Sequence, residues 1–312
     1  MKSATVFTEA GTTYGYGHLT RCIAIAQALY TKKIKTHFII RGDISQFSLL
    51  AGCTFEITEW NCFRSIEKIP VSFLSIIDSY YADEDLCRYI QEKSHVSVFI
   101  DDYNRIIYPG GYVLNSGINA EHIRYPVCNN VEYLLGARFQ PLRMEFWDTP
   151  QYQVNEGIEN ILMIFGGSDA SNKTLQYYRL MRSFFPDKQF HVITGMSQQS
   201  RDSILAENDR KTTLYRSLST EDVMRVMVNA DLAVSAAGQT IFELARIGVP
   251  TVGVVVAKNQ EYNYNNWVKT GFLFHENEIS RCFSYEQRRN ASDIGRSIVD
   301  GKGVFRIIEK LL

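Results

Sequence analysis

The sequence predicts an α/β protein of two domains, each with a parallel sheet covered by helices on both faces. The chain has 312 residues, of which 45% are hydrophobic and 21% are charged, a composition that suits two globular domains. Short apolar runs alternate with helical patterns, as expected for parallel sheets. This alternation starts afresh after Pro150, so the chain divides near its middle.

The first half begins with buried strands of about five residues, rich in β-branched and aromatic side chains. In the first predicted helix, Cys22, Ile25, Ala26 and Leu29 recur at helical spacing. The predicted strands are 4–7, 36–40, 73–77 and 96–100, and the predicted helices are 19–31 and 84–93.

The second half repeats this pattern. Its predicted strands are 160–165, 189–194, 232–235 and 249–256, and its helices are 173–184, 220–229 and 240–247. With 145–159 as a linker, we expect an N-terminal domain of residues 1–150 and a C-terminal domain of residues 151–312. Ligands of parallel sheets bind at the carboxyl ends of the strands, so we expect the site in a cleft between the domains.

Composition excludes several classes of function. The net charge is −1 and no basic run occurs, which argues against binding to nucleic acid or to anionic membranes. The six cysteines contain no C-x-x-C pair, and the acidic runs 83–85 and 101–102 have no histidine partner, so we expect no metal and no cofactor. Without a signal peptide or an 18-residue apolar run, we expect a soluble, cytoplasmic protein without stable membrane insertion. Nothing indicates an oligomeric state.

The first strand leads into a glycine-rich loop, residues 8–18. Gly15 and Gly17 let the backbone turn and approach a ligand, and His18 then opens a helix. No third glycine follows at the spacing of G-x-G-x-x-G, which argues against a dinucleotide. We expect His18 to face the cleft, kept neutral by the helix N-terminus. A helix-capping histidine is the alternative.

Two further loops follow strands. Asp78 and Tyr80 come directly after the strand 73–77, and Asp78 is either a site residue or the cap of the next helix. In the second half, Gly167, Ser168 and Asp169 suit a phosphate or sugar close to the backbone, or form a tight turn capped by the aspartate.

The most informative stretch joins the strand 232–235 to the helix 240–247. Its small-residue turn, 236–240, predicts a nest for a diphosphate. Glu243 lies on the helix face of Gln239, where a carboxylate would repel phosphate but could accept hydrogen bonds from ribose hydroxyls. Amides at Asn259 and Gln260 suit a neutral sugar.

The segment from Gly238 to Glu243 resembles the nucleotide-binding segment of the lipid-II-forming N-acetylglucosaminyl transferases, inverting enzymes of the GT-B fold. The chain is more closely similar to the UDP-sugar hydrolases of the pseudaminic acid pathway, through a glycine–His–x–x–Arg signature at 15–21 and an Asp-x-Tyr element at 78–80. Further similar landmarks stand at Asn115, 136–139, 142–146, 166–169 and 259–260. The chain departs from that family at 7–13, where Arg-x-Asp is usual, and in a longer 105–112 segment.

The resemblance implies a GT-B-like fold, with two Rossmann-like domains facing across a cleft. It implies metal-independent hydrolysis, with inversion, of a UDP-linked diacetamido-trideoxy sugar to free sugar and UDP, in nonulosonic acid biosynthesis. His18 would orient or deprotonate the water, and Tyr80 and Asp78 would complete the catalytic set. The backbone near 218–223 would contact uracil. The implied UDP-sugar contacts are Gly15, Gly17, Arg21, Gly167, Ser168, Asp169, Ala237, Gly238, Gln239, Thr240, Glu243, Asn259 and Gln260.

Three alternatives stay open. An inverting GT-B glycosyltransferase could use the same donor, although a membrane acceptor would call for an apolar and basic patch on the first domain, and no such cluster shows in the sequence. A UDP-sugar 2-epimerase would need several carboxylates and histidines in the cleft. A non-enzymatic sensor of sugar nucleotides is the third.

Overall fold

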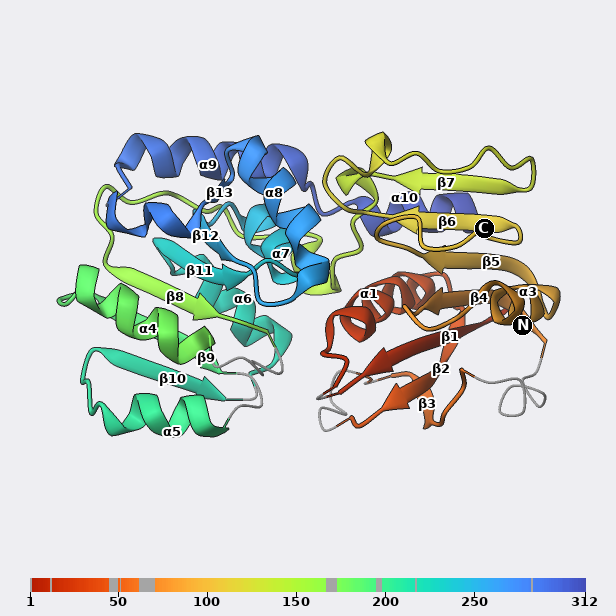
Figure 1. The fold of residues 1–312 in the computed structure, drawn as a ribbon, viewed down its shortest axis with the longest axis horizontal. Coiled ribbons are helices and arrows are strands. Elements are labelled where there is room, and N and C mark those ends of the chain that lie inside the picture. Colours follow the sequence, from red (N-terminus) through yellow and green to blue (C-terminus); the bar gives the residue numbers. More distant parts are fainter. Residues whose placement is uncertain are drawn as a thin grey trace. The chain divides into compact units, whose positions relative to one another are not determined.

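The computed structural model describes residues 2–11, 13–44, 50, 52–61, 71–166, 173–194, 198–216, 218–281 and 283–312. The chain forms two compact units, Met1–Met144 with Gly301–Leu312, and Glu145–Asp300. Both termini therefore belong to the first unit (Figure 1). This division differs from the expected domains 1–150 and 151–312 chiefly in the last twelve residues, which return to the first unit.

The first unit is built on a seven-stranded parallel sheet of order β3-β2-β1-β4-β5-β6-β7. The order reverses between β1 and β4, and ligands of doubly wound sheets bind at such a switch point. The strands are β1 (Ser3–Ala10), β2 (Lys35–Gly42), β3 (Thr54–Ile57), β4 (Ser72–Asp78), β5 (Ser94–Ile100), β6 (Gly111–Asn115) and β7 (Val131–Leu135).

Helices cover this sheet. They are α1 (Gly17–Thr31), α3 (Glu84–Glu92), α10 (Gly303–Leu311) and the short 3-10 helices η2 (Ala120–His122) and η3 (Ala137–Phe139). A further 3-10 helix, η4 (Met144–Phe146), spans the boundary between the two units. Leu86, Cys87 and Ile90 of α3 pack with Phe7 of β1 and Trp60 in one buried cluster. The cap of α3 is Asp83, whose side chain accepts the N–H of Leu86 at 2.8 Å. The alternative reading of Asp78 as the cap of this helix is therefore wrong.

Helix α10 was not predicted, and it belongs to the first unit. Val304, Ile307 and Ile308 form its buried face, and the helix packs against α1 and η3. Gly303 comes so close to Gln140 that a Cβ there would lie 2.2 Å from the Gln140 carbonyl oxygen. Blue α10 accordingly lies beside yellow β6 and β7 in Figure 1.

The second unit has a six-stranded parallel sheet of order β10-β9-β8-β11-β12-β13, which reverses between β8 and β11. Both sheets thus share the doubly wound order. The strands are β8 (Asn160–Ile164), β9 (Gln189–Thr194), β10 (Thr212–Arg216), β11 (Leu232–Ala236), β12 (Thr251–Val254) and β13 (Leu273–Phe274). The helices are α4 (Lys173–Phe184), α5 (Gln198–Ala206), α6 (Thr220–Val228), α7 (Thr240–Ile247), η5 (Lys258–Gln260), α8 (Glu261–Thr270), η6 (Glu276–Arg281) and α9 (Tyr285–Ile298).

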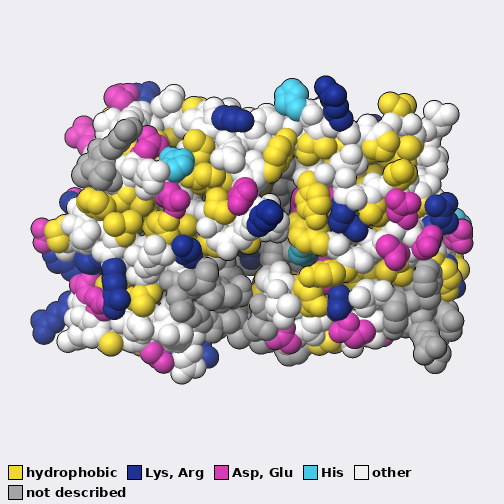
Figure 2. Space-filling view, viewed as in Figure 1, with side chains coloured by type: hydrophobic (Ala, Val, Ile, Leu, Met, Phe, Trp, Pro, Cys, Tyr) yellow, Lys and Arg dark blue, Asp and Glu magenta, His cyan; other side chains and the backbone are white. Residues whose placement is uncertain are grey.

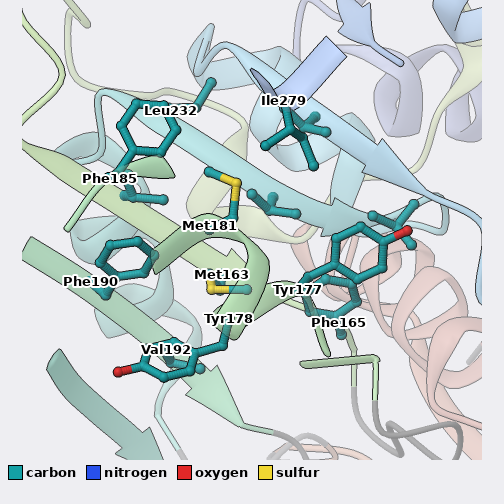
Figure 3. Packing of buried hydrophobic residues seen from close by; sticks show 14 of the residues in the cluster. Met163, Phe165, Tyr177, Tyr178, Met181, Phe185, Phe190, Val192, Leu232 and Ile279 are labelled. Carbon is teal, nitrogen blue, oxygen red and sulfur yellow. The ribbon is translucent and has the colours of Figure 1, made fainter. Parts of the chain in front are cut away.

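The core of the second unit is rich in aromatic residues and methionine (Figure 3). Met163 of β8 and Met181 of α4 are buried among the rings of Phe185, Phe190 and Tyr178. Flexible methionine side chains fill the irregular spaces that rings leave. This packing fixes β8 and β11, whose ends carry the candidate nucleotide loops.

Over the face shown in Figure 2, basic side chains are interspersed with acidic ones, in line with a net charge of −1. Among the described residues, no helix combines the length and apolar character needed to cross a membrane. Nor does any group of three or more His, Cys, Asp or Glu side chains in that part of the chain form a metal-binding arrangement.

Candidate active site

The switch point of the first sheet carries the three residues predicted to be catalytic. His18 lies in the first turn of α1, which follows β1, while β4 ends at Asp78, two residues before Tyr80. Nδ1 of His18 lies 2.6 Å from Oδ1 of Asp78. The rings of His18 and Tyr80 meet edge to face, with centroids 4.6 Å apart. The structure therefore gathers His18, Asp78 and Tyr80 into one cluster.

The contact between His18 and Asp78 determines which ring nitrogen carries hydrogen. Burial alone would raise the pKa of Asp78, but the charges and hydrogen bonds of Arg21 and His18 together outweigh burial and hold that pKa far below its usual range. An ionised carboxylate only accepts hydrogen bonds, so Nδ1 of His18 donates to it. Nε2 of the neutral ring then carries a lone pair, and it has no hydrogen-bond partner among the described residues. Nε2 can therefore take up a proton.

Arg21 contacts the pair of His18 and Asp78, and its guanidinium is held by the carboxylates of Asp78 and Asp102. It donates from Nε and Nη2 to Asp78 at 2.6 and 2.7 Å, and from Nη1 and Nη2 to Asp102 at 2.8 and 3.2 Å. Tyr80 donates its phenolic hydrogen to the same Asp102. The expected role of Arg21 was a direct substrate contact, whereas in the structure its guanidinium organises the two aspartates. Removing one member of such a buried ion pair costs about 3–5 kcal/mol.

The electrostatic surroundings of His18 contradict the expectation of a ring kept neutral by the helix N-terminus. Burial lowers the pKa of His18, but the charge and hydrogen bond of Asp78, together with the charge of Asp102, outweigh burial, and the pKa is raised above its ordinary value. Two carboxylates against one guanidinium leave a net negative environment, which favours the imidazolium. That prediction is therefore wrong, and the cluster favours proton uptake at Nε2.

The capping alternative for His18 is also wrong. The cap position of α1 is Tyr16, which makes no side-chain capping bond, and His18 bonds to Asp78 instead. Gly15 adopts a positive φ of 74° and is tied to Gly11 by two backbone hydrogen bonds. A Cβ on Gly17 would meet nothing within 4 Å, so neither packing nor the backbone requires glycine there. Open space beside Gly17 suits the close approach of a ligand.

Asp102 is a member of the cluster that was not predicted. Asp101 and Asp102 follow β5, and successive side chains of an extended segment point in opposite directions. Asp101 is buried and accepts the Tyr125 hydroxyl at 2.6 Å, so it holds the fold, whereas Asp102 reaches Arg21. The signal in the sequence that could have identified Asp102 is the acidic pair that follows β5, the strand next to β4.

Glu9, at the end of β1, was also not predicted. It is 1% exposed, and Ser79 donates its hydroxyl hydrogen to Oε1 of Glu9. Ser79 Oγ accepts the N–H groups of Tyr81 and Ala82 at 2.9 and 3.1 Å. Burial raises the pKa of Glu9. Glu9 stands in the segment 7–13, where the chain departs from the family that it resembles.

The second unit places its predicted nucleotide turn between β11 and α7, at the switch point of the second sheet. The N–H of Ala237 bonds to Val254 O at 2.9 Å, and the N–H of Gly238 bonds to Ala236 O at 2.8 Å. These two amides are occupied, in contrast to the predicted phosphate nest over 236–240. The Gly238 Cα faces open space, because a Cβ there would meet only Gln260 Nε2, at 3.5 Å.

Amide side chains surround this turn. Gln260 Oε1 accepts the N–H of Val256 at 3.1 Å, and Asn259 is exposed beside it on η5. Asn263 of α8 ends the segment expected to supply amides, and its buried Oδ1 has no hydrogen-bond partner among the described residues. Glu243 is 3% exposed, one turn into α7. Gln239 and Thr240 are half-buried at the helix start, and Gly167, Ser168 and Asp169 lie outside the described residues.

Comparison with known sequences finds similarity to proteins of nucleotide-sugar metabolism. Residues 161–273 match the Glycosyltransferase family 28 C-terminal domain. MJ1062 of Methanocaldococcus jannaschii is 23% identical, over 98% of this chain and 65% of its own length. The "Pseudaminic acid cytidylyltransferase and UDP-2,4-diacetamido-2,4,6-trideoxy-beta-L-altropyranose hydrolase" of Helicobacter pylori is 25% identical, over 80% of this chain and 43% of its own length. The chain thus spans less than two thirds of either relative.

"Spore coat polysaccharide biosynthesis protein SpsG" of Bacillus subtilis is 22% identical, over 97% of this chain and 95% of its own length. Among solved structures, MurG of Acinetobacter baumannii superposes with a TM-score of 0.65 at 13% identity, covering 99% of this chain and 98% of MurG. MnaA of S. aureus, in a co-structure with UDP, superposes with a TM-score of 0.69 at 10% identity, covering 99% of this chain and 95% of MnaA. The chain therefore has the GT-B fold, two Rossmann-like α/β units, and its residues 161–273 match the Glycosyltransferase family 28 C-terminal domain.

Proposed function

We propose that this protein hydrolyses a UDP-linked diacetamido-trideoxy sugar to free sugar and UDP, with inversion and without a metal. The observation that carries the proposal is the pair of His18 and Asp78, in which Nδ1 is held at 2.6 Å and Nε2 is left to accept a proton. The resemblance to the pseudaminic acid pathway hydrolases and the name of the Helicobacter pylori relative support this substrate class.

The proposed step is a single displacement. Nε2 of His18 takes a proton from water, the water oxygen bonds to the anomeric carbon, and the bond from that carbon to the phosphate oxygen breaks. The electron pair leaves on UDP. The imidazolium that forms is stabilised by Asp78, whose charge raises the pKa of His18. Attack opposite the departing UDP inverts the anomeric centre.

Tyr80 has a defined part in this scheme. Tyr80 donates its phenolic hydrogen to Asp102, so its phenolic oxygen can act only as an acceptor towards a further partner such as the water. A water that donates one hydrogen to Tyr80 and the other to His18 has its own lone pair directed at the anomeric carbon. Tyr80 is therefore proposed to orient the water.

The second unit is proposed to hold UDP. Helix α7 starts at Thr240, and its N-terminal dipole favours a departing diphosphate. Glu243 is proposed to bind the ribose, and Gln260 and Asn259 to face polar groups of the sugar nucleotide. In the first unit, Gly15 and Gly17 are proposed to let the ligand approach the backbone closely.

The experiment is a reaction of the purified protein with UDP-2,4-diacetamido-2,4,6-trideoxy-β-L-altropyranose in ¹⁸O-water, followed by NMR and mass spectrometry, with and without EDTA. We expect label in the sugar, an inverted first-formed anomer, and no effect of EDTA. Label in UDP would mean attack at phosphorus and would exclude the mechanism.

An inverting glycosyltransferase is the second candidate, because MurG and "CalG4, the Calicheamicin Glycosyltransferase" share the fold, the latter with a TM-score of 0.62 at 11% identity over 99% of this chain and 97% of CalG4. The same histidine would then deprotonate an acceptor hydroxyl. Absence of sugar release from the UDP-sugar in buffer, with release restored by an added alcohol acceptor, would favour the transferase.

A further inference from the structure

A pocket of the first unit is lined by none of His18, Asp78 and Tyr80, although its lining includes Tyr125, which bonds to Asp101. It has a volume of about 470 Å³ and is lined by Arg105 and Ile107 from the β5–β6 connection, and by Arg124 and Pro126 from the β6–β7 connection. We infer that this pocket binds a small organic anion, a carboxylate or phosphate group carried on an apolar frame.

The charge of the pocket supports an anion. Within the described part of the chain, the guanidinium groups of Arg105 and Arg124 have no ion pair and no hydrogen bond. The hydrogen bonds of these two residues are made by backbone atoms: the N–H of Arg105 donates to Asp101, and the carbonyl of Arg124 accepts from Asn104. Glu84, the acidic residue of the lining, accepts the N–H of Ile107 at 3.2 Å. Two arginines and one glutamate leave a net charge of +1. Planar guanidinium groups match the paired oxygens of carboxylate and phosphate.

The walls support an apolar frame. Ile107 is 60% exposed, and Ile106 and Pro126 are half-buried beside it. An amphiphilic anion would contact Ile107 with its apolar part and the guanidinium groups of Arg105 and Arg124 with its charged group. Burial of the apolar part would add to the free energy of the ionic contact.

The two arginine segments are held together by internal bonds. Asn104, at a φ of 60°, donates from its backbone N–H to Asp101 Oδ2 at 2.6 Å and from Nδ2 to the carbonyl of Arg124 at 3.0 Å. Tyr125 donates its hydroxyl to Asp101 at 2.6 Å and accepts from Asn115 at 3.0 Å. The pocket is thus preorganised, which lowers the entropic cost of binding.

No contiguous stretch of the sequence displayed this patch. Arg105 and Arg124 are separated by nineteen positions and meet only because β5 and β6 are neighbours in the sheet. The two arginines therefore form no cluster in the sequence, in keeping with the absence of a basic run there. Tyr103, which precedes Asn104 of the lining in the chain, has its ring centroid 5.7 Å from that of Tyr80.

Calorimetric titration of the full chain tests the inference. The probes are hexanoate and hexyl phosphate, with acetate and inorganic phosphate as the head groups alone. We expect saturable binding of the six-carbon probes and at least about tenfold weaker binding of the bare head groups. Comparing hexanoate with hexyl phosphate identifies the preferred head group.

The variants Arg105→Ala and Arg124→Ala should each weaken probe binding about tenfold or more, the loss expected for one charged hydrogen-bond partner. Ile107→Ser should weaken only the six-carbon probes. Arg88→Ala, an exposed arginine of α3 outside the lining, is the matched control and should bind as the wild type does. Unchanged melting curves would confirm folding. The inference is overturned if the wild type shows no saturable binding, or if Arg88→Ala loses as much affinity as Arg105→Ala.

Discussion

Nδ1 of His18 lies 2.6 Å from Oδ1 of Asp78, while the other oxygen of that carboxylate accepts from Arg21 Nε, also at 2.6 Å. Asp78 thus links the residue proposed to move a proton with a permanently charged guanidinium. Asp78 is the last residue of β4, and His18 and Arg21 lie in the first two turns of α1, so one strand end and one helix hold the pair of His18 and Asp78 in place. The first three predictions test this arrangement.

His18→Asn keeps a hydrogen-bonding side chain near Asp78 but removes the base. We expect kcat to fall by about 10²-fold or more, the usual loss for a general base, with little change in KM. Steady-state kinetics on the UDP-sugar measures both. His95→Asn, an exposed histidine of β5, is the matched control and should leave kcat unchanged. A preserved kcat with a raised KM would make His18 a binding residue.

The pH profile should follow the raised pKa of His18. Because the base must be neutral to accept a proton, activity is lost as pH falls through that pKa, so the midpoint of the acid limb should lie above about 6.5. Asp78→Asn removes the charge that raises the pKa, and the midpoint should then move to lower pH, with a smaller kcat. The same midpoint in both proteins would mean that another group controls the limb.

Tyr80→Phe keeps the ring against His18 and removes the hydroxyl that bonds to Asp102. We expect a fall in kcat of about tenfold, equivalent to one lost hydrogen bond to the water, and an unchanged acid-limb midpoint. Tyr103→Phe, which alters a neighbouring ring, is the control. Equal kcat values for Tyr80→Phe and the wild type would remove Tyr80 from the mechanism.

Glu243→Ala should weaken UDP binding more than it affects folding. If Glu243 accepts ribose hydroxyls, the loss should be about tenfold or more in Kd. Calorimetry with UDP measures the affinity, and thermal melting measures stability. Glu243→Gln, which keeps the shape of this buried side chain, separates packing from charge, and Glu286→Ala on exposed α9 is the control. An unchanged Kd would make Glu243 a structural residue.

Glu9→Gln should stabilise the fold at alkaline pH. Burial raises the pKa of Glu9, so its contribution to stability is complete below the unfolded pKa and is lost as pH rises through the folded pKa. The amide introduced by this substitution avoids that loss and can still accept from Ser79. We expect a higher Tm at about pH 8 and a difference that shrinks towards about pH 4. Glu56→Gln, an exposed position of β3, should show no such trend.

The sequence predicts the fold well where strands are buried. The core strands β1, β4, β8 and β11 are buried and mostly apolar, so their positions can be predicted from the sequence. Strand β3 is exposed along its whole length and carries no such run, so it was not predicted. Helix α9 was missed for a related reason, because its mostly polar residues include the buried Arg288.

The candidate site divides in a similar way. A parallel sheet brings the carboxyl ends of its strands to one edge, so residues that follow strand ends can be predicted to lie together. This holds for His18, Asp78 and Tyr80. Asp102 and Glu9 stand at equivalent strand ends, yet which face each side chain takes depends on the pleat and on neighbours such as Arg21 and Ser79. The raised pKa of His18 was not predicted, because it comes from Asp78 and Asp102, which only the fold brings close to the ring.

The return of α10 to the first unit has a consequence for synthesis on the ribosome. Residues 301–312 supply α10, whose Arg306 bonds to the Arg138 carbonyl at 2.9 Å, while the Tyr112 hydroxyl bonds to the Lys310 carbonyl at 2.9 Å. The unit that is translated first therefore lacks one of its helices until after the second unit has been translated. Residues 145–300 form an uninterrupted stretch, so all of the second unit is available to fold while the face of α1 that contacts α10 is still uncovered, and the first unit can be completed only last.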